Sequence, residues 1–233
     1  MTLDQHIQQL NSIENIDEVF AYLGQKIDAK IVFSTSFGIE DQVITQKIAA
    51  LNLKNIEFFT LDTGRMFAET YALWEKTQNH YKIKIKGYNP DQQQVEDFVL
   101  ENGINAFYDS PELRKSCCGI RKVQGLKRAL QGVGIWITGL RAEQSENRQN
   151  TNLFEWDDNF KLFKFNPLIK WTFEEVKDYV RKNYIPYNPL HDKGFVSIGC
   201  APCTRAIKEG EDFRAGRWWW EDQSKKECGL HKS

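Results

Sequence analysis

Short apolar runs rich in β-branched and aromatic residues alternate with helical patterns along the first 140 residues of the chain. The runs predict strands over residues 30–34, 56–61, 82–86 and 135–138, and the segments between them show helical spacing. Such alternation is typical of a mostly parallel sheet with right-handed crossovers and helices on its faces. We therefore expect an α/β fold.

The ends of the predicted strands mark the expected ligand site. In open parallel sheets, ligands bind beyond the carboxyl ends of the strands. Three of these ends are polar or contain glycine, namely residues 34–38, 62–64 and 139–141. We expect a small-molecule site where they meet.

The pattern changes after about residue 188, where loops, glycines and cysteines give way to a tail rich in tryptophan and charge. We expect an α/β domain over residues 1–190, which includes Cys117 and Cys118. A C-terminal segment over residues 191–233 would carry the second cysteine pair and a mobile tail.

Charge and hydropathy exclude several classes of protein. Lys and Arg total 31 against 32 Asp and Glu, a net charge of -1, so binding along duplex nucleic acid is not expected. No apolar stretch approaches the roughly 18 residues of a membrane span. The first six residues lack the basic region and apolar core of a secretory signal. A cytosolic protein without nucleic-acid or membrane partners is expected.

Five cysteines carry most of the functional information. A reducing cytosol disfavours disulfides, so these residues point to metal binding, catalysis or simple burial. Cys117 and Cys118 are adjacent, Cys200 and Cys203 form a Cys-x-x-Cys pair, and Cys228 lies near the end. The set therefore divides into four plus one.

Four thiolates bind either a tetrahedral zinc ion or an iron–sulfur cluster. The adjacent side chains of Cys117 and Cys118 diverge, which makes them a poor chelate for one small ion. A [4Fe-4S] cubane is larger and presents separate irons to neighbouring sulfurs, so the spacing favours it. Zinc, and buried free cysteines with a redox pair, remain the alternatives.

Cys228 is the candidate nucleophile. Lys225, Lys226 and His231 each favour its thiolate form, and Gly229 makes the surrounding chain pliable. A single cysteine near a chain end is also often incidental. Assigning the other four cysteines to a metal centre strengthens the catalytic interpretation.

Residues 34–41 lie between a predicted strand and a predicted helix. Hydroxyl groups, a glycine and a helix N-terminus suit an anion, although the same residues serve as an ordinary helix cap. The loop resembles the phosphate-binding loop of the adenosine nucleotide α-hydrolases, whose ATP pyrophosphatases carry Ser-Gly-Gly-x-Asp-Ser. Thr35 and Ser36 replace the two glycines here, which indicates a ligand other than intact ATP.

Taken together, the motifs resemble those of the assimilatory adenylyl-sulfate reductases, a family shared with the phosphoadenylyl-sulfate reductases. The matching segments are residues 34–41, 61–65, 117–123, 137–141, 200–205, 210–221 and 227–231. The resemblance implies an adenosine nucleotide α-hydrolase-like fold in which residues 1–190 bind the nucleotide.

The resemblance also implies a reaction in sulfate assimilation and cysteine biosynthesis. Cys228 would attack the sulfur of adenylyl sulfate, displace AMP and become a Cys S-sulfonate. Thioredoxin, or glutaredoxin with glutathione, would then release sulfite. No further free cysteine remains to resolve the adduct, so an external dithiol is required.

Site residues follow from the same resemblance. Cys117, Cys118, Cys200 and Cys203 would bind a [4Fe-4S] cluster. Lys122, Arg214 and Arg217 would contact the phosphate and sulfate, with Arg141 close by. Ser34, Ser36, Leu61 and Gly139 would hold the adenosine and phosphate at the strand ends.

Several alternatives stay open. Family members with both cysteine pairs mostly use adenylyl sulfate, so that substrate is favoured over the 3′-phosphorylated form, and activity on both is an alternative. An ATP pyrophosphatase that adenylates its substrate and a cluster- or zinc-binding redox sensor are more remote. Homo-oligomers are common in the family.

Overall fold

A computed structural model of the chain describes residues 1–144, 148–149 and 151–221. The chain forms two compact units that interleave in sequence. The first unit contains Met1–Phe59, Ala72–Lys86 and Gly132–Asn188, and the second contains Thr60–Tyr71, Gly87–Gln131 and the chain from Pro189 onward. The division into domains expected at residue 190 stays a prediction.

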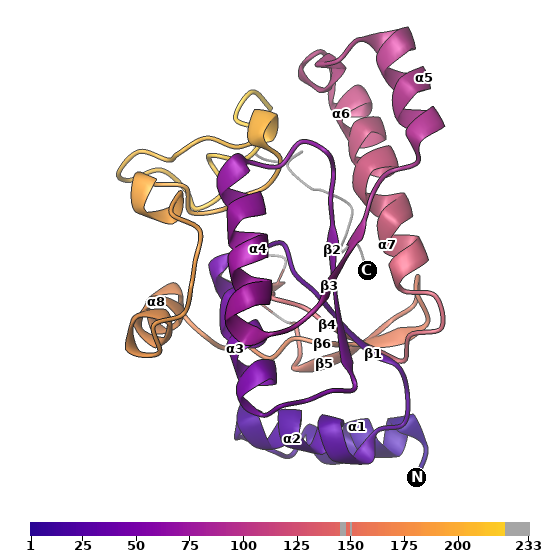
Figure 1. The fold of residues 1–233 in the computed structure, drawn as a ribbon, viewed down its shortest axis with the longest axis vertical. Helices are drawn as coiled ribbons and strands as arrows, with labels where there is room; N and C mark the ends of the chain where they lie inside the picture. The colour runs from indigo at the N-terminus through magenta and orange to yellow at the C-terminus, as the bar shows by residue number, and fades with distance from the viewer. Residues whose placement is uncertain (145–147, 150, 222–233) are drawn as a thin grey trace. The chain divides into compact units, whose positions relative to one another are not determined.

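A six-stranded sheet has the order β3-β2-β1-β4-β6-β5 (Figure 1). Strand β1 pairs in parallel with β2 and β4, β4 pairs in parallel with β6, and β5 pairs antiparallel with β6. The strands are β1 (Ile31–Ser34), β2 (Ile56–Leu61), β3 (Ile85–Tyr88), β4 (Ile135–Ile137), β5 (Phe154–Asp157) and β6 (Leu162–Phe165). The expected α/β fold with a mostly parallel sheet is confirmed.

Eight α-helices occur in the described part of the chain: α1 (Leu3–Leu10), α2 (Ile16–Lys26), α3 (Ile39–Ala50), α4 (Ala68–Tyr81), α5 (Gln92–Asn102), α6 (Pro111–Cys118), α7 (Gln124–Ala129) and α8 (Phe173–Lys182). A π-helical turn over Gly119–Val123 joins α6 to α7. Short 3-10 turns cover Ala106–Tyr108, Ala142–Gln144, His191–Lys193 and Ala201–Cys203. No helix in these ranges is both long and apolar enough to cross a membrane.

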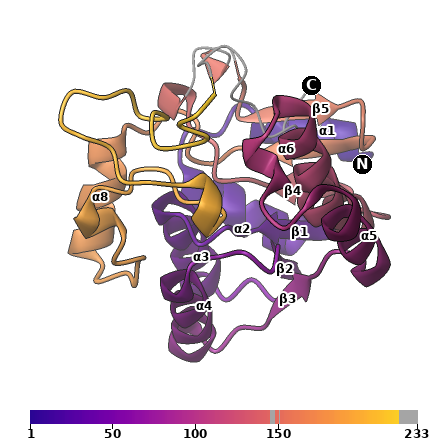
Figure 2. The same cartoon turned by 90° about the horizontal axis from the view of Figure 1, so that it is seen from above.

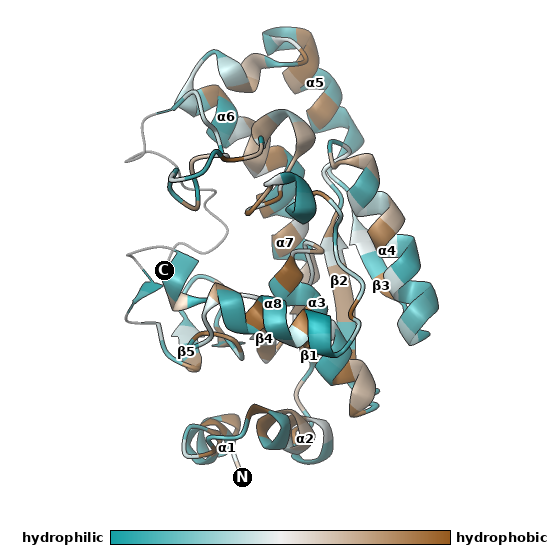
Figure 3. Ribbon diagram, turned by 90° about the vertical axis from the view of Figure 1, so that its left-hand side faces the viewer, coloured by the Kyte–Doolittle hydropathy of each residue, from teal (hydrophilic) through white to brown (hydrophobic). Residues whose placement is uncertain are grey.

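The core of the first unit lies between its helices and the sheet. Ile31 and Phe33 of β1 are fully buried. The rings of Phe20 in α2 and Phe165 in β6 pack edge to face, with their centroids 5.3 Å apart. Helices α3 and α4 run side by side (Figures 1 and 2), joined by a hydrogen bond from Gln42 to Thr77. Helix α8 is mainly hydrophilic (Figure 3), and its Val176 is buried. This packing fixes the carboxyl end of β1.

Local signals set three boundaries, and the start of β3 differs from the sequence prediction. The N-terminal stretch forms two helices, because Thr2 begins α1 with a capping box and Asn15 begins α2. Strand β3 begins at Ile85 rather than at residue 82, because Lys82 has φ 55°, which ends α4 and excludes an extended chain there. Helix α4 begins at Ala68, after the turn around Gly64 (φ 68°).

Candidate active site

The loop after β1 bends sharply into α3. The Phe37 backbone lies in the left-handed region (φ 61°), and its ring is buried against Trp74 at 5.7 Å. Thr35 holds the bend because its hydroxyl accepts a hydrogen bond from the Phe37 N–H at 3.0 Å. A non-glycine residue in this conformation costs about 1–3 kcal/mol, so the buried ring is what maintains the turn.

Ser36 is exposed in this loop, and both of its hydrogen-bond donors bind the buried Asp41. Its N–H and hydroxyl both donate to Asp41 Oδ2, at 2.6 and 2.8 Å. Burial raises the pKa of Asp41 to about 7, although the two hydrogen bonds from Ser36 oppose that shift. The N-terminus of α3 thus carries the chain's own carboxyl group, which disfavours a highly charged pyrophosphate there.

Gly139 packs against the same carboxyl group. A Cβ atom at this position would lie 2.1 Å from Asp41 Oδ1, so no other residue fits without displacing Asp41. The glycine therefore permits the close approach of the segment after β4 to the start of α3.

Arg141 is completely buried and lies between carboxylates. Its Nε donates to Glu40 Oε1 at 2.8 Å and its Nη1 to Glu143 Oε2 at 2.6 Å. These ion pairs join the first turn of α3 to the chain after β4. The structure places Arg141 as a support of the loop, and direct contact with the substrate stays a prediction.

Ser34 ends β1 and is half-buried. Its hydroxyl accepts a hydrogen bond from Trp136 Nε1 of β4 at 2.8 Å. Leu61 ends β2 and packs against Gly125 of α7, where an added Cβ would lie 3.3 Å from Leu61 Cδ2. Each of these residues lies at the carboxyl end of its strand, as the sequence predicts.

The second unit brings both cysteine pairs to one pocket. Cys117 and Cys118 end α6, and Cys200 and Cys203 flank the short turn at Ala201–Cys203. The pocket encloses about 330 Å³ of empty space, part of it open to solvent. Its lining is Arg65, Phe107, Arg114, Cys117, Cys118, Arg121, Lys122, Cys200, Pro202 and Cys203.

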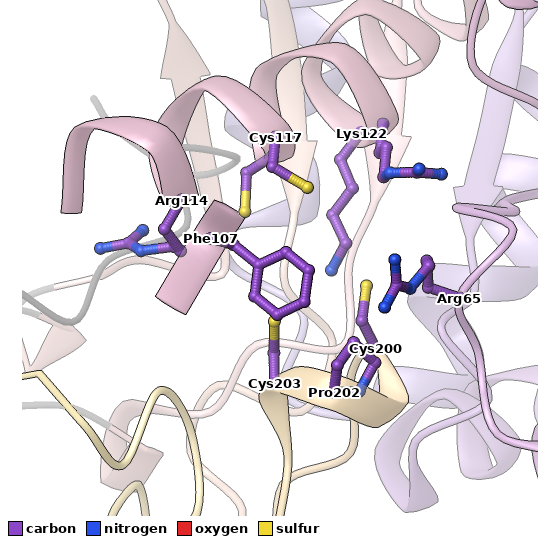
Figure 4. Close-up of a pocket in the computed structure, with 10 residues that line it drawn as sticks. Arg65, Phe107, Arg114, Cys117, Lys122, Cys200, Pro202 and Cys203 are labelled. Atoms are coloured by element: carbon purple, nitrogen blue, oxygen red, sulfur yellow. The ribbon is translucent and has the colours of Figure 1, made fainter. Parts of the chain in front are cut away.

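Lys122 extends from the π-helical turn toward the space bordered by Cys117, Cys200 and Cys203 (Figure 4). Cationic side chains line the pocket together with the sulfurs, whereas no Asp or Glu occurs among the described lining residues. The pocket therefore suits anions, including thiolates.

Burial disfavours the thiolate form of two of the pocket's cysteines. Burial raises the pKa of Cys117, which Arg121 opposes. Burial and the neighbouring Cys200 raise the pKa of Cys203 to about 12, which Arg217 and Lys122 oppose. A metal centre would hold these sulfurs as thiolates.

The donor set fits an iron–sulfur cluster in chemistry, since four cysteines line the pocket and no other metal-binding side chain does so in the described chain. Among the described residues, no group of three or more His, Cys, Asp or Glu is gathered to hold one metal ion. Four cysteines are also the donor set of a tetrahedral zinc ion, so zinc stays the alternative to the cluster.

Two residues missed by the sequence analysis connect the cysteine pairs. Arg121 hydrogen-bonds the Cys117 sulfur and donates to the Thr63 carbonyl at 2.7 Å. The Thr63 hydroxyl lies 3.3 Å from Cys200 Sγ. Both residues occur in matching segments of the family resemblance, residues 61–65 and 117–123. The sequence therefore pointed to these segments but did not show that Thr63 and Arg121 contact each other.

Arg217 is buried beside the second cysteine pair. A Cβ on Gly199 would lie 2.4 Å from Arg217 Nη2, so the glycine makes room for the guanidinium. Arg217 Nε has no hydrogen-bond partner among the described residues, as expected of a group that binds a ligand. Arg214 is half-buried, and its carbonyl accepts from the Arg217 N–H at 2.9 Å.

A buried ion pair ends the described chain beside the pocket. Arg114 of α6 donates to both carboxylate oxygens of Glu221, at 2.9 and 2.8 Å. The centroid of the Trp218 ring lies 4.6 Å from the guanidinium of Arg114 and 4.7 Å from that of Arg217. The candidate nucleophile Cys228 lies outside the described residues.

Comparison with known proteins identifies the family. The model of the phosphoadenosine phosphosulfate reductase domain matches residues 30–206. A protein of Sinorhizobium fredii (strain USDA 257) named adenosine 5′-phosphosulfate reductase is 53% identical over 205 residues, covering 88% of this chain and 81% of that protein. The enzyme of the same name from Allochromatium vinosum is 49% identical over 215 residues, covering 92% and 83%.

Solved structures agree with the fold. The phosphoadenylyl-sulfate reductase of Candida auris, in a phosphate complex, aligns with a TM-score of 0.73 at 26% identity and covers 89% of this chain and 98% of that chain. The NH3-dependent NAD synthetase of Campylobacter jejuni aligns with a TM-score of 0.51 at 12% identity, covering 76% and 73%, which shows a shared fold alone. The chain therefore belongs to the phosphoadenosine phosphosulfate reductase family, and so to the oxidoreductases that act on sulfur.

Proposed function

We propose that this enzyme reduces adenylyl sulfate to sulfite and AMP in sulfate assimilation, with thioredoxin or glutaredoxin as reductant. The observation that carries the proposal is the gathering of both cysteine pairs, far apart in sequence, in one pocket with Lys122. Relatives about half identical to the chain are named adenosine 5′-phosphosulfate reductase, which supports the unphosphorylated nucleotide as substrate.

The loop residues of the first unit suit the nucleoside. Ser34, Ser36 and Gly139 lie at strand ends or in the loops that follow them, and Asp41 neutralises the local donors. Leu61, which ends β2 and belongs to the second unit, is proposed as a further substrate contact. Arg141 supports this arrangement through its ion pairs with Glu40 and Glu143.

In the first step, the Cys228 thiolate attacks the sulfur of the sulfate group. A sulfur–sulfur bond forms, the bond between that sulfur and the oxygen bridging to phosphate breaks, and AMP leaves with the electron pair. Lys122, Arg214 and Arg217 offset the negative charge on the sulfate and phosphate oxygens. The product on the enzyme is a Cys228 S-sulfonate.

In the second step, a thiolate of the reductant attacks the Cys228 sulfur. Sulfite leaves with the electron pair of the sulfur–sulfur bond, and a mixed disulfide joins the two proteins. The second thiol of the reductant resolves that disulfide and releases the Cys228 thiolate. The dithiol is oxidised by two electrons, which match the reduction of sulfate sulfur to sulfite.

Cys117, Cys118, Cys200 and Cys203 would hold a [4Fe-4S] cluster. When bound, the cluster supplies a rigid link between the cysteine pairs and a fixed negative charge beside Lys122. Thr63 and Arg121 also link the cysteine-bearing segments through their own hydrogen bonds. Electron transfer does not require the cluster, since thiol chemistry supplies both electrons.

Anaerobically purified enzyme tests the proposal. Iron and sulfide are counted, and sulfite release from adenylyl sulfate is measured with reduced thioredoxin and, separately, with glutaredoxin and glutathione. We expect iron and sulfide in the ratio of a [4Fe-4S] cluster, and sulfite with at least one reductant. Mass spectrometry without reductant should show one sulfonate on Cys228.

The rival functions give different results. If only 3′-phosphoadenylyl sulfate yields sulfite, that nucleotide is the substrate in place of adenylyl sulfate. If both nucleotides yield sulfite, the enzyme has dual specificity. Release of pyrophosphate from ATP would favour an adenylating enzyme. Protein that releases no sulfite from either nucleotide would overturn the reductase, and the cysteines would then indicate a sensor. Location in the cytosol and assembly into homo-oligomers stay predictions.

A further inference from the structure

The hydrogen bond between Trp136 and Ser34 has only one possible direction. An indole N–H donates and never accepts, so Ser34 Oγ is the acceptor of this 2.8 Å bond. The proton of the Ser34 hydroxyl must then be donated to another group. No residue in the described chain accepts the Ser34 hydroxyl proton, and the side chain is half-buried, so a ligand could reach it.

The register of the sheet explains why these two side chains meet. Val32 of β1 pairs with Trp136 of β4, so Ser34, two residues on, lies on the same face and nearer the carboxyl ends of the strands. The Trp136 side chain therefore reaches Ser34 from within the sheet. The hydroxyl proton is thereby free to be donated at the carboxyl ends of the strands, where the proposed ligand binds.

Trp136 is held rigidly. It is 1% exposed, meets the edge of Phe160 at 5.9 Å, and lies 5.7 Å from the Lys164 ammonium. Lys164 is in turn fixed by an ion pair with Asp157 at 2.6 Å. The indole N–H thus stays in place whether or not a ligand is bound.

We infer that Trp136 is a positioning residue, which orients the Ser34 hydroxyl as a hydrogen-bond donor to an acceptor atom of the nucleotide. The inference rests on the proposed function, because it needs the nucleotide to bind at Ser34. An oriented hydroxyl binds more tightly than a free one, since less rotational freedom is lost on binding. The acceptor is a lone pair on the base, the ribose or the phosphate.

The test measures AMP affinity by calorimetry for wild type, Ser34→Ala, Trp136→Phe and the double variant. Loss of one hydrogen bond should weaken AMP binding roughly three- to tenfold in Ser34→Ala. Trp136→Phe should weaken it within the same range, and the double variant should bind no more weakly than Ser34→Ala. The KM for adenylyl sulfate should rise in Trp136→Phe while kcat is unchanged, because uniform binding is lost.

Two results would overturn the inference. Wild-type AMP affinity in Trp136→Phe, beside weakened binding in Ser34→Ala, would show that Trp136 does not orient the hydroxyl. Unchanged affinity in Ser34→Ala would remove Ser34 from the site, and sulfite release by that variant would show that the proposed reaction survives. Phe160→Leu is the control, since it alters packing on Trp136 and leaves the N–H in place.

A second variant covers the case in which Trp136→Phe does not fold. Benzothienylalanine at position 136 keeps the bicyclic shape and replaces the N–H by sulfur, so it removes the donor alone. It should reproduce the loss of AMP affinity with a melting temperature near that of wild type. Binding of adenosine and of ribose 5-phosphate to wild type and Ser34→Ala assigns the acceptor to the nucleoside or to the phosphate.

Discussion

The loop after β1 and the cysteine pocket balance their charges in opposite ways. In the loop, Glu40 and Glu143 pair with the guanidinium of Arg141, and Asp41 accepts both donors of Ser36. The described lining of the pocket has cationic side chains and thiols but no carboxylate. The first arrangement suits an uncharged nucleoside, and the second suits anions such as metal-bound thiolates and sulfate. The two regions therefore suit ligands of different charge.

The largest effect is expected from Cys228→Ser, which should leave both binding regions intact and remove only the nucleophile. Turnover should fall roughly ten-thousandfold or more, because a serine hydroxyl is a poor nucleophile without an adjacent base. AMP affinity and iron content should equal those of wild type. Substantial sulfite release by this variant would exclude the S-sulfonate route.

Cys203→Ser makes the same cysteine-to-serine change as Cys228→Ser, but in the pocket, and it should remove iron as well as activity. Iron content should fall close to background, and turnover should fall by roughly a hundredfold or more, since metal sites depend on every ligand. AMP affinity should stay near that of wild type. Iron analysis and calorimetry on both cysteine variants measure the contrast, and full iron retention in Cys203→Ser would count against its role as a ligand.

Lys122→Ala tests the cationic character of the pocket. We expect kcat/KM for adenylyl sulfate to fall roughly a hundredfold, as for loss of a partner to a buried charge. Lys115→Ala is the matched control, because Lys115 is exposed on α6, the helix that precedes the turn of Lys122. Steady-state kinetics of both variants measure the difference, and equal losses would show that general surface charge explains the effect.

Asp41→Asn tests the balance of charge in the loop through the pH dependence of stability. The pKa of Asp41 is about 7 in the folded enzyme, above the value of about 4 in an unfolded chain, so the folded state binds the proton more tightly. Its contribution to stability is therefore present below pH 4, is lost as the pH rises from 4 to 7, and stays lost above 7.

Removing the carboxyl group should remove this dependence. Relative to wild type, Asp41→Asn should gain about 2–3 kcal/mol of stability between pH 5 and pH 8. Urea unfolding of both proteins at the two pH values gives the difference. A constant difference would show that Asp41 ionises normally in the folded enzyme.

The sequence predicts the parts of the fold that local patterns encode. Apolar runs located β1, β2 and β4, and therefore the strand ends at Ser34, Leu61 and Gly139. Cysteine spacing located the residues that share the pocket. These features depend on neighbouring residues, or on motifs long enough to be specific.

Features that depend on tertiary partners were not predicted. Strands β5 and β6 were missed, because Lys164 is charged yet buried, and the fold alone shows that it forms an ion pair with Asp157 across the hairpin. The burial of Arg141 depends on Glu40, which lies about a hundred residues earlier in the chain. A basic residue in a motif suggests a ligand contact, and only the fold shows that carboxylates already surround it.

The π-helical turn at Gly119–Val123 makes this region sensitive to length as well as to sequence. The Gln124 N–H bonds to the Gly119 carbonyl, one residue farther back than in an α-helix. Deleting one residue here would restore an ordinary helix and rotate α7 by about 100° relative to α6. Gly125 would then turn away from Leu61. Natural variants of the enzyme should accordingly rarely insert or delete a residue within this turn.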